Sequence, residues 1–458
     1  MRFNLPLGYT IYPVGAIGDG AQFISGYAFK SKDFVNAGYP IIKIKNIQDG
    51  IVTIADSQYV SPKTVNGLDR FKLKNGDILI AMTGQGSVGR VGRLSCDEGH
   101  EPYLNQRVGK FLADEKKLNI DFLYYILSTK EYQEVLFLSG SGSGQPNLSP
   151  STIKSIEIPF APYDIQCKIA DILNSIDARI ISNKKINQTL EQIAQALFKS
   201  WFVDFEPVKA KIAVLEAGGS QEEATLAAMT AISGKDTDSL AVFAHERPEQ
   251  YAELKATAEL FPSAMQDSEL GEIPVGWDSQ RLSNLAILHY GKALKKTERI
   301  EGPYPVYGSG GVTGSHNNYL VEGPSIIVGR KGSIGTLYWE NRKFHPIDTV
   351  YYVDNKEGIP LSYIYYLMKT LNLPGMNTDA AVPGLNRDNV YRLEVLKPVQ
   401  SILSKFNDHI STIRNSIQKN DNSMTTLIEL RDTLLPKLLS GEITLPEAEQ
   451  AVSEAENV

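Results

Sequence analysis

Polar side chains that suit contacts with a nucleic acid are concentrated in a few short, glycine-rich runs. The first half of the chain has two of them, residues 85–93 and 105–107, and the second half has residues 308–318 and 330–333. Glycine lets a backbone approach a phosphate closely, while Ser, Thr and backbone N–H groups bond phosphate oxygens. Arg matches the edge of guanine, and Asn or Gln matches the edge of adenine.

A smaller polar group, rich in lysine, precedes these runs in the first half. Together these stretches give the candidate DNA-contact residues Lys30, Lys43, Lys45, Asn46, Gln85, Ser87, Arg90, Arg93, Gln106, Arg107, Ser309, Ser315, His316, Asn317, Arg330, Lys331 and Ser333. The alternative is that the runs are turns between strands, with their Arg and Lys side chains solvated.

No familiar catalytic or cofactor motif is present. The chain lacks a Gly-x4-Gly-Lys-Ser/Thr phosphate loop, and its six histidines and two cysteines have no metal-ligand spacing. The triplet Asp114-Glu115-Lys116 is interpreted as solvated surface, and residues 141–144 as a flexible loop rather than a nucleophile elbow. We therefore expect no catalytic residue, no metal and no cofactor in this chain.

Charge is unevenly distributed. The net charge is −7, but residues 203–270 alone carry 13 Asp or Glu against 5 Lys or Arg, whereas residues 1–160 carry 15 against 17. The main body of each half can therefore offer a DNA-binding face. No apolar run is long enough to span a membrane, the first ten residues lack an apolar signal core, and two cysteines are too few for a disulfide framework, so a cytoplasmic protein is expected.

Two long helices are expected to position the polar runs. Apolar residues at spacings that are mostly three or four mark one face of residues 164–202, namely Ile169, Ile172, Ile176, Ile186, Leu190, Ile193 and Leu197. A similar stripe runs from Leu403 to Leu438. We expect the two helices to form an antiparallel coiled coil in which Asn183 lies opposite Asn420 and fixes the register. The alternative is that each helix packs separately on its own domain.

The two halves also repeat one plan. Short motifs recur in the same order, for example GSVG at residues 86–89 and GSIG at 332–335, and FLYYI at 122–126 and YIYYL at 363–367. The fold class is therefore α/β, more loosely α+β, with two similar domains joined by the coiled coil. The predicted parts are residues 1–161 and 271–398 (the two domains), 162–203 and 399–441 (the long helices), 204–270 (an acidic helical insert, solvated or facing a partner) and 442–458 (an acidic, mobile tail).

The chain resembles the specificity subunits of type I restriction–modification systems along its whole length. The most specific segments are ALFKSWFVDFEP at 196–207 and LLPKLLSGEI at 434–443, supported by GYAFKSKDF at 26–34, YPVYGSGG at 304–311 and ELGEIP at 269–274. The resemblance implies two target-recognition domains that each read half of a split, asymmetric DNA sequence, with the paired helices acting as a ruler.

The same resemblance implies partners. These are double-stranded DNA, two modification subunits that methylate adenine N6 with S-adenosylmethionine, and restriction subunits that use ATP and Mg, whereas the specificity subunit itself is not catalytic. Apolar residues at the helix ends (Phe198, Trp201, Phe202, Leu438 and Leu439) would either anchor the modification subunits or close the helix bundle. Two rivals to DNA recognition are an interaction scaffold without DNA affinity and an enzyme with an unrecognised site.

Overall fold

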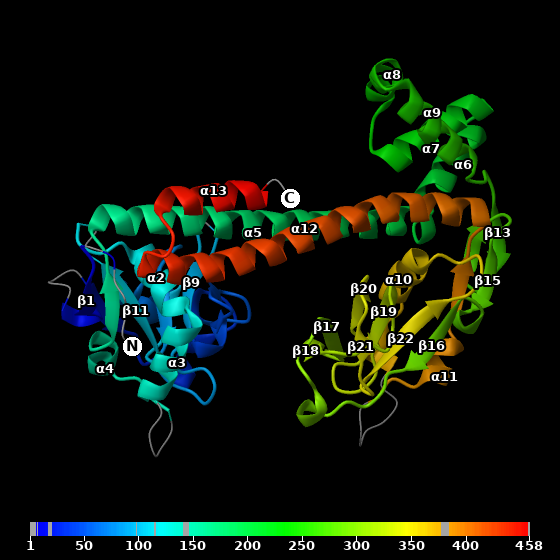
Figure 1. Ribbon diagram of the computed structural model, residues 1–458. Helices are drawn as coiled ribbons and strands as arrows, with labels where there is room; N and C mark the ends of the chain where they lie inside the picture. Colours follow the sequence, from blue (N-terminus) through cyan, green and yellow to red (C-terminus); the bar gives the residue numbers. More distant parts are fainter. Residues whose placement is uncertain are drawn as a thin grey trace. The chain divides into compact units, whose positions relative to one another are not determined.

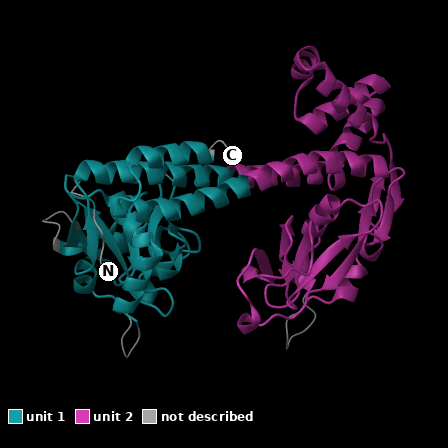
Figure 2. Cartoon of the chain, in the orientation of Figure 1, with its two compact units in different colours: residues 1–185, 420–458 teal, residues 186–419 magenta. Residues whose placement is uncertain are grey.

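The chain folds into two compact units, which Figure 2 shows in different colours. The computed structural model describes residue 6 and residues 8–16, 21–97, 99–113, 116–140, 146–376 and 384–456. Unit 1 comprises residues 1–185 and 420–458, and unit 2 comprises residues 186–419. Asp114, Glu115 and residues 141–144, which were interpreted from the sequence above, lie outside the described residues.

Unit 1 contains a six-stranded sheet in the order β2-β11-β8-β9-β6-β5, a four-stranded sheet in the order β10-β4-β7-β3, and the pair β1-β12. The strands are β1 (Thr10–Pro13), β2 (Ala21–Ser25), β3 (Phe34–Val35), β4 (Tyr39–Ile42), β5 (Ile47–Gln48), β6 (Ile51–Thr53), β7 (Gln58–Val60), β8 (Ile78–Ala81), β9 (Val91–Ser95), β10 (Tyr103–Leu104), β11 (Val108–Ala113) and β12 (Glu157–Phe160). The helices are α1 (Pro62–Val65), α2 (Ile120–Ser128), α3 (Lys130–Gly140), α4 (Pro150–Lys154), the first part of α5 (Tyr163–Phe202), the last part of α12 (Gln400–Ser440) and α13 (Leu445–Glu456).

Strand β8 shows why this sheet is buried on both faces. Side chains alternate across a strand, so Ile78 and Ile80 join the core beneath α2, while Leu79 and Ala81 join a second core with β4 and β6. The side chain of Asn119 caps the start of α2 by accepting a hydrogen bond from the backbone N–H of Phe122 (3.0 Å).

Unit 2 contains a four-stranded sheet in the order β16-β22-β19-β20, a three-stranded sheet in the order β18-β17-β21, and two strand pairs. The strands are β13 (Met265–Ser268), β14 (Gly271–Pro274), β15 (Asp278–Arg281), β16 (Ala286–Tyr290), β17 (Tyr304–Gly308), β18 (Gly311–His316), β19 (Ser325–Gly329), β20 (Leu337–Glu340), β21 (His345–Pro346), β22 (Val350–Asn355) and β23 (Glu394–Lys397). Its helices are α6 (Glu206–Glu216), α7 (Gln221–Ser233), α8 (Thr237–Glu246), α9 (Pro248–Glu259), α10 (Leu361–Thr370) and α11 (Arg387–Tyr391), together with the remaining parts of α5 and α12 (Figure 1).

The two units repeat one topology, as the sequence motifs predicted. Strand β11 pairs antiparallel with β2 and β8, just as β22 pairs with β16 and β19. The parallel pair of β10 with β4 recurs as β21 with β17, and the pair β1-β12 recurs as β15-β23. This equivalence confirms the expected fold class of two similar α+β domains with two long helices.

A glycine marks the same close approach in both units. A Cβ atom added to Gly26 would lie 2.2 Å from the carbonyl oxygen of Asn105, and one added to Gly291 would lie 2.1 Å from that of Ile347. Both distances are far below any tolerable contact, so no larger residue fits without a shift of backbone. The two glycines follow the equivalent strands β2 and β16 directly.

Helices α5 and α12 pair antiparallel within each unit. In unit 1, Asp177 meets Arg431 and Asn183 meets Ser423, so that a higher residue number on α5 meets a lower one on α12. In unit 2, Glu191 meets Arg414 and Phe198 meets Phe406 in the same sense. The Nδ2 atom of Asn183 lies 3.4 Å from the Oγ of Ser423, three residues beyond the expected partner Asn420, and the pairing of Asn183 with Asn420 stays a prediction.

One part of the expected seam is wrong. Ile186 and Ile193 of α5 are 46% and 50% exposed, whereas Ala194, Phe198 and Trp201 are buried. The helix turns its aromatic face inward here because burial of large aromatic side chains stabilises the core of unit 2 more than burial of two isoleucines would.

A Tyr–carboxylate–Arg cluster ties each domain to both long helices. In unit 1, the Tyr125 hydroxyl of α2 donates to Asp177 of α5 (2.8 Å), which pairs with Arg431 of α12 (2.9 Å). In unit 2, the equivalent Tyr366 of α10 donates to Glu191 of α5 (3.2 Å), which pairs with Arg414 of α12 (3.0 Å). Each domain is thus fixed to the helix pair by one partly buried set of polar contacts as well as by apolar packing.

The apolar helix ends close the cores of their own units. Phe198, Trp201 and Phe202 are buried in unit 2, and Leu438 and Leu439 are buried in unit 1. Fully packed side chains offer no surface to a partner, so this favours the bundle-closing interpretation over direct anchoring.

The acidic tail and the insert are both helical. Instead of a mobile tail, residues 445–456 form α13, whose Ala448 and Val452 are buried in the core of unit 1 because they share one face of the helix. The insert forms the four helices α6 to α9, in agreement with the helical insert that the sequence predicted, around a small core of its own that includes Met229 and Leu240. Among the described residues, no helix is long and apolar enough to cross a membrane.

Candidate nucleic-acid interface

Three loops of unit 1 lie together at one edge of its sheets: residues 43–46 after β4, 82–90 between β8 and β9, and 105–107 between β10 and β11. The backbone N–H of Met82 donates to the carbonyl of Arg107 (2.9 Å), which joins the second and third loops. A Cβ on Gly84 would lie 3.1 Å from Cδ1 of Ile44, which places the first loop against the second. The fold therefore brings together polar runs that are far apart in the chain, residues 43–46, 82–90 and 105–107.

Three cations, Lys43, Lys45 and Arg107, lie close to one another at this edge. Lys43 is half-buried, its ammonium group lies 4.1 Å from the centre of the Phe34 ring, and it also donates to the side chain of Gln58. Burial lowers the pKa of Lys43, and the positive charges of Lys45 and Arg107 lower it further. Because the charges that act on Lys43 are positive, an anion bound here would relieve their repulsion.

Two residues expected to contact DNA instead hold unit 1 together. Asn46 is buried; its Nδ2 donates to the carbonyls of Thr53 (3.1 Å) and Ala55 (3.0 Å), and its Oδ1 accepts from the backbone of Lys43. Its amide therefore organises the loop and is not free to read a base.

Arg93 is the second such residue. It pairs with Asp121 (3.0 Å), donates to Asn174 (3.0 Å) and stacks 4.5 Å from the ring centre of Tyr124, so it joins β9 to α2 and α5. Alternation along β9 turns this side chain toward the helices, which the sequence run of residues 85–93 did not reveal.

The other predicted residues of unit 1 are more accessible. Lys30, Lys45, Gln85, Arg90, Gln106 and Arg107 are exposed, and Ser87 is half-buried. Arg90 donates to the carbonyl of Gly86 within its own loop (2.6 Å), and the Ser87 hydroxyl donates weakly to the carbonyl of Thr83 (3.4 Å). These contacts shape the 82–90 loop and leave its outer surface open to solvent.

Unit 2 brings together the equivalent three loops: residues 309–310 between β17 and β18, 330–336 between β19 and β20, and 347–349 between β21 and β22. The backbone N–H of Arg330 donates to the carbonyl of Thr349 (2.9 Å), the same bond that joins Met82 to Arg107 in unit 1. The Thr336 hydroxyl donates to the carbonyl of Ser309 (2.6 Å), and the Ser309 hydroxyl accepts from the backbone of Ser333 (3.4 Å). The first of these loops has Ser309 and Gly310 where unit 1 has lysines, and the cations of this edge, Arg330 and Lys331, lie on the 330–336 loop.

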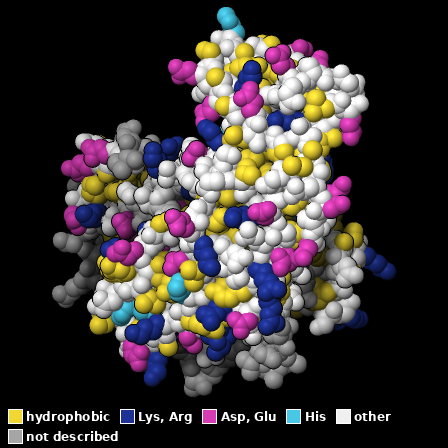
Figure 3. All heavy atoms as spheres, turned by 90° about the vertical axis from the view of Figure 1, so that its right-hand side faces the viewer, with side chains coloured by type: hydrophobic (Ala, Val, Ile, Leu, Met, Phe, Trp, Pro, Cys, Tyr) yellow, Lys and Arg dark blue, Asp and Glu magenta, His cyan; other side chains and the backbone are white. Residues whose placement is uncertain are grey.

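The predicted residues of unit 2 divide in a similar way. Asn317, Lys331 and Ser333 are exposed, and Ser309, Ser315 and Arg330 are half-buried. His316 is buried, and its Nδ1 accepts a hydrogen bond from the backbone of Ile300 (3.1 Å), which favours a structural role for this side chain over a DNA contact. The face of the molecule in Figure 3 shows Lys and Arg among Asp and Glu rather than one continuous basic patch.

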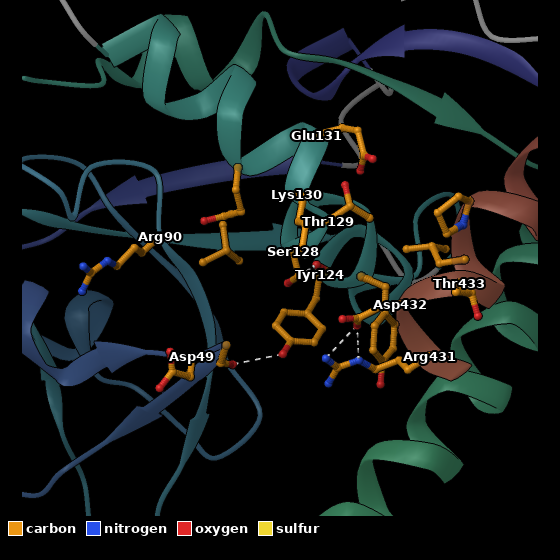
Figure 4. A pocket seen from close by; sticks show the side chains of 16 residues that line it. Asp49, Arg90, Tyr124, Ser128, Thr129, Lys130, Glu131, Arg431, Asp432 and Thr433 are labelled. Atoms are coloured by element: carbon orange, nitrogen blue, oxygen red, sulfur yellow. Dashed lines mark hydrogen bonds and ion pairs between the residues drawn. The ribbon is translucent and has the colours of Figure 1, made fainter. Parts of the chain in front are cut away.

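A pocket of about 650 Å³ opens next to the end of the 82–90 loop of unit 1, between α2, α3, the start of β9 and the end of α12 (Figure 4). Its lining includes Arg90, Lys130, Glu131 and Arg431, but neither His nor Cys. Arg431 is engaged by Asp177 and Asp432, and the Ser128 hydroxyl donates to the carbonyl of Tyr124 (2.7 Å). The lining thus contains no activated nucleophile. Within the described ranges, no cluster of three or more His, Cys, Asp or Glu could hold a metal ion.

Comparison with known proteins places the chain in a family. The family model "Type I restriction modification DNA specificity domain" matches twice, at residues 12–192 and 274–420. The HindI specificity subunit of Haemophilus influenzae is 32% identical over 83% of this chain and 89% of its own length, and the MjaIX specificity subunit of Methanocaldococcus jannaschii is 26% identical over 71% and 70%.

A solved structure agrees with the fold. The type I restriction–modification S subunit from M. genitalium covers 96% of this chain and 99% of its own, with a TM-score of 0.50 at 19% identity. The chain belongs to the type I restriction–modification DNA specificity family. It is a non-catalytic DNA-recognition subunit that assembles with other subunits of such a system.

Proposed function

We propose that each unit reads one half of a split, asymmetric DNA target, with residues 1–161 and 271–398 as the two target-recognition domains. The observation that carries this is the shared loop scaffold with different side chains. The bond between Met82 and Arg107 and the bond between Arg330 and Thr349 hold equivalent loops in place, yet the loops present different chemistry. Base-edge recognition depends on side-chain type and position, so the two halves of the target differ.

The described contacts narrow the set of DNA-contact residues. In unit 1 it is Lys30, Lys43, Lys45, Gln85, Ser87, Arg90, Gln106 and Arg107, and in unit 2 it is Ser309, Ser315, Asn317, Arg330, Lys331 and Ser333. We propose that the paired helices, residues 162–203 and 399–441, set the number of base pairs between the half-sites, as a fixed distance between reading elements does in other DNA-binding proteins. Since its ligand is DNA of the cell, the expected location is the cytoplasm.

The partner subunits supply the chemistry in this proposal. Two modification subunits methylate adenine N6 with S-adenosylmethionine, and restriction subunits use ATP and Mg. The exposed isoleucines of α5, Ile186 and Ile193, form with the half-buried Leu190 and Leu197 an apolar stripe that α12 leaves partly uncovered. An apolar helix stripe of this kind is suited to packing against partner helices.

Base-resolution mapping of methylated adenines tests the proposal. The host is compared with the gene present, deleted, and restored. We expect deletion to remove methylation at one split, asymmetric motif and restoration to return it. Methylation that is unchanged by deletion, combined with no DNA binding by the purified complex with its modification subunits, would leave only an interaction scaffold. Turnover by the isolated chain would instead indicate an enzyme.

A further inference from the structure

Two arginines of unit 2 pack against the ring of one exposed tyrosine. Tyr290, the last residue of β16, is 48% exposed. The guanidinium carbon of Arg330 lies 4.8 Å from the centre of its ring, and that of Arg387 lies 4.9 Å from it. Arg330 follows β19 and Arg387 is the first residue of α11, so three separate elements of the unit converge on one ring. The sequence had not singled out Tyr290 or Arg387.

Neither arginine has a carboxylate partner among the described residues. Arg330 donates to the carbonyl of Asp348 (2.9 Å), and Arg387 approaches the carbonyl of Leu288 (3.5 Å) and has a buried Nε without an acceptor.

Three other half-buried arginines pair with acids, whereas the fourth, Arg299, has only Thr313 and the carbonyl of Leu294 as acceptors among the described residues. Arg93, Arg414 and Arg431 lie 2.9–3.0 Å from Asp121, Glu191 and Asp177, respectively. The two arginines at Tyr290 differ from those three in having no acid partner among the described residues.

Two cations on one aromatic ring repel each other, and the ring offsets only part of that cost. The main-chain carbonyls and the ring fix the planes of the guanidinium groups, which leaves further N–H donors for an outside acceptor. A phosphate offers a compensating negative charge and several acceptor oxygens, and arginine is the side chain best suited to bind it in a fixed orientation.

We propose that Tyr290, Arg330 and Arg387 form a clamp for one phosphate of the DNA backbone at the second half-site. This rests on the proposed function, because it requires unit 2 to bind DNA. Arg330 and Arg387 contact the phosphate, and Tyr290 is a positioning residue that holds both. Unit 1 has Met82 at the position of Arg330 and Ser25 at that of Tyr290, as the matching backbone bonds and strand pairs show, so the clamp belongs to the second half-site alone.

The test measures DNA affinity of the complex with its modification subunits across a range of salt concentrations. For Arg387→Ala we expect about tenfold weaker binding at low salt and a salt slope smaller by about one, as for the loss of one phosphate contact. Tyr290→Phe keeps the ring and should bind as the unchanged complex does, whereas Tyr290→Ala should weaken binding. Arg392→Ala is the matched control, because it removes an exposed arginine just after the same helix.

Two results would overturn the clamp. One is an unchanged salt slope for Arg387→Ala, equal to that of Arg392→Ala. The other is an unchanged slope with relaxed preference at a single base pair, which would assign Arg387 to base reading. If the complex with the unsubstituted chain does not bind DNA, the proposed function itself is contradicted, whatever the variants do. A hydrogen-exchange comparison confirms that each variant is folded.

Discussion

The two reading edges share a backbone and differ in where they place positive charge. One N–H to carbonyl bond joins loops in both units, from Met82 to Arg107 in unit 1 and from Arg330 to Thr349 in unit 2. The arginine of this bond therefore lies on the β10–β11 loop in unit 1 (Arg107) and on the β19–β20 loop in unit 2 (Arg330). A duplicated scaffold can thus present different recognition chemistry without any change of topology, since the strand ladder fixes the loops and leaves their side chains free to vary.

The Tyr–carboxylate–Arg clusters of the two units also differ in the sign of the charge that the helix following each domain supplies. Asp177 of α5 and Arg414 of α12 each lie on the helix that follows their own domain, yet one is an acid and the other a base. Each then meets its opposite charge on the other helix. Two copies of α5 in the same antiparallel register would bring Asp177 and Glu191 together instead, so this reversal favours pairing of α5 with α12.

The largest expected effect compares how strongly the apolar ends of α5 and α12 stabilise the units in which they are buried. Trp201→Ala should destabilise unit 2 by about 3–5 kcal/mol, because it leaves a large cavity among Phe202, Phe261 and Phe406. Leu438→Ala, at the corresponding end of α12, should cost unit 1 less. Hydrogen exchange, followed peptide by peptide, reports each unit separately. Equal losses in both units after either substitution would show that the two cores do not unfold independently.

The shared scaffold itself is tested by its glycines. Gly26→Ala and Gly291→Ala should each cost about 1–3 kcal/mol, since the new methyl group would collide with a carbonyl oxygen that the strands hold in place. Gly310→Ala is the control, because nothing lies within 4 Å of a Cβ there. Urea denaturation measures the differences. A neutral result at only one of the two sites would break the equivalence between units.

The charge difference between the reading edges predicts an unequal effect on DNA. Arg107→Ala should weaken binding of the assembled complex about tenfold, or about 1.4 kcal/mol, because it removes one of three gathered cations. Thr349→Ala, at the equivalent position of unit 2, should change the affinity less. Salt-dependent titrations with the cognate target measure both. Equal effects would contradict a difference in how the two edges bind.

The smallest effect concerns the polar cluster of unit 2. Burial works against the charged form of Glu191, but Arg414 and Lys369 outweigh it and hold the pKa of this carboxyl below its ordinary value of 4.5. A lowered pKa stabilises the folded state above the ordinary value, and that stability is lost as the pH falls through the folded pKa. Glu191→Gln should therefore cost about 1 kcal/mol at neutral pH and flatten the loss of stability in acid.

The matched control for Glu191→Gln is Asp408→Asn, an exposed carboxylate on α12 within the same unit. Unfolding free energies of unit 2 measured from neutral to acid pH compare the two. A pH dependence that stays as steep in Glu191→Gln as in the unchanged protein would assign the acid sensitivity to another group.

Much of this architecture follows from the sequence alone. The repeated motifs identified the duplication, since the same apolar and turn residues build the same strands, as with Ile78–Ile80 in β8 and Ile326–Val328 in β19. The three-and-four spacing located both long helices, whose ends at Phe202 and Ser440 lie within two residues of the predicted ones. These features are local, and local patterns record which face of an element is buried.

Tertiary structure decided which of the polar residues are available to DNA. Asn46, Arg93 and His316 have the right chemistry and lie in or beside the right loops, but other elements of their own units bury or engage them. Tyr290 and Arg387 carry no local signal, because 97 residues separate two side chains that meet only in the folded domain. Sequence spacing determines the elements, but long-range packing decides which side chains they leave exposed.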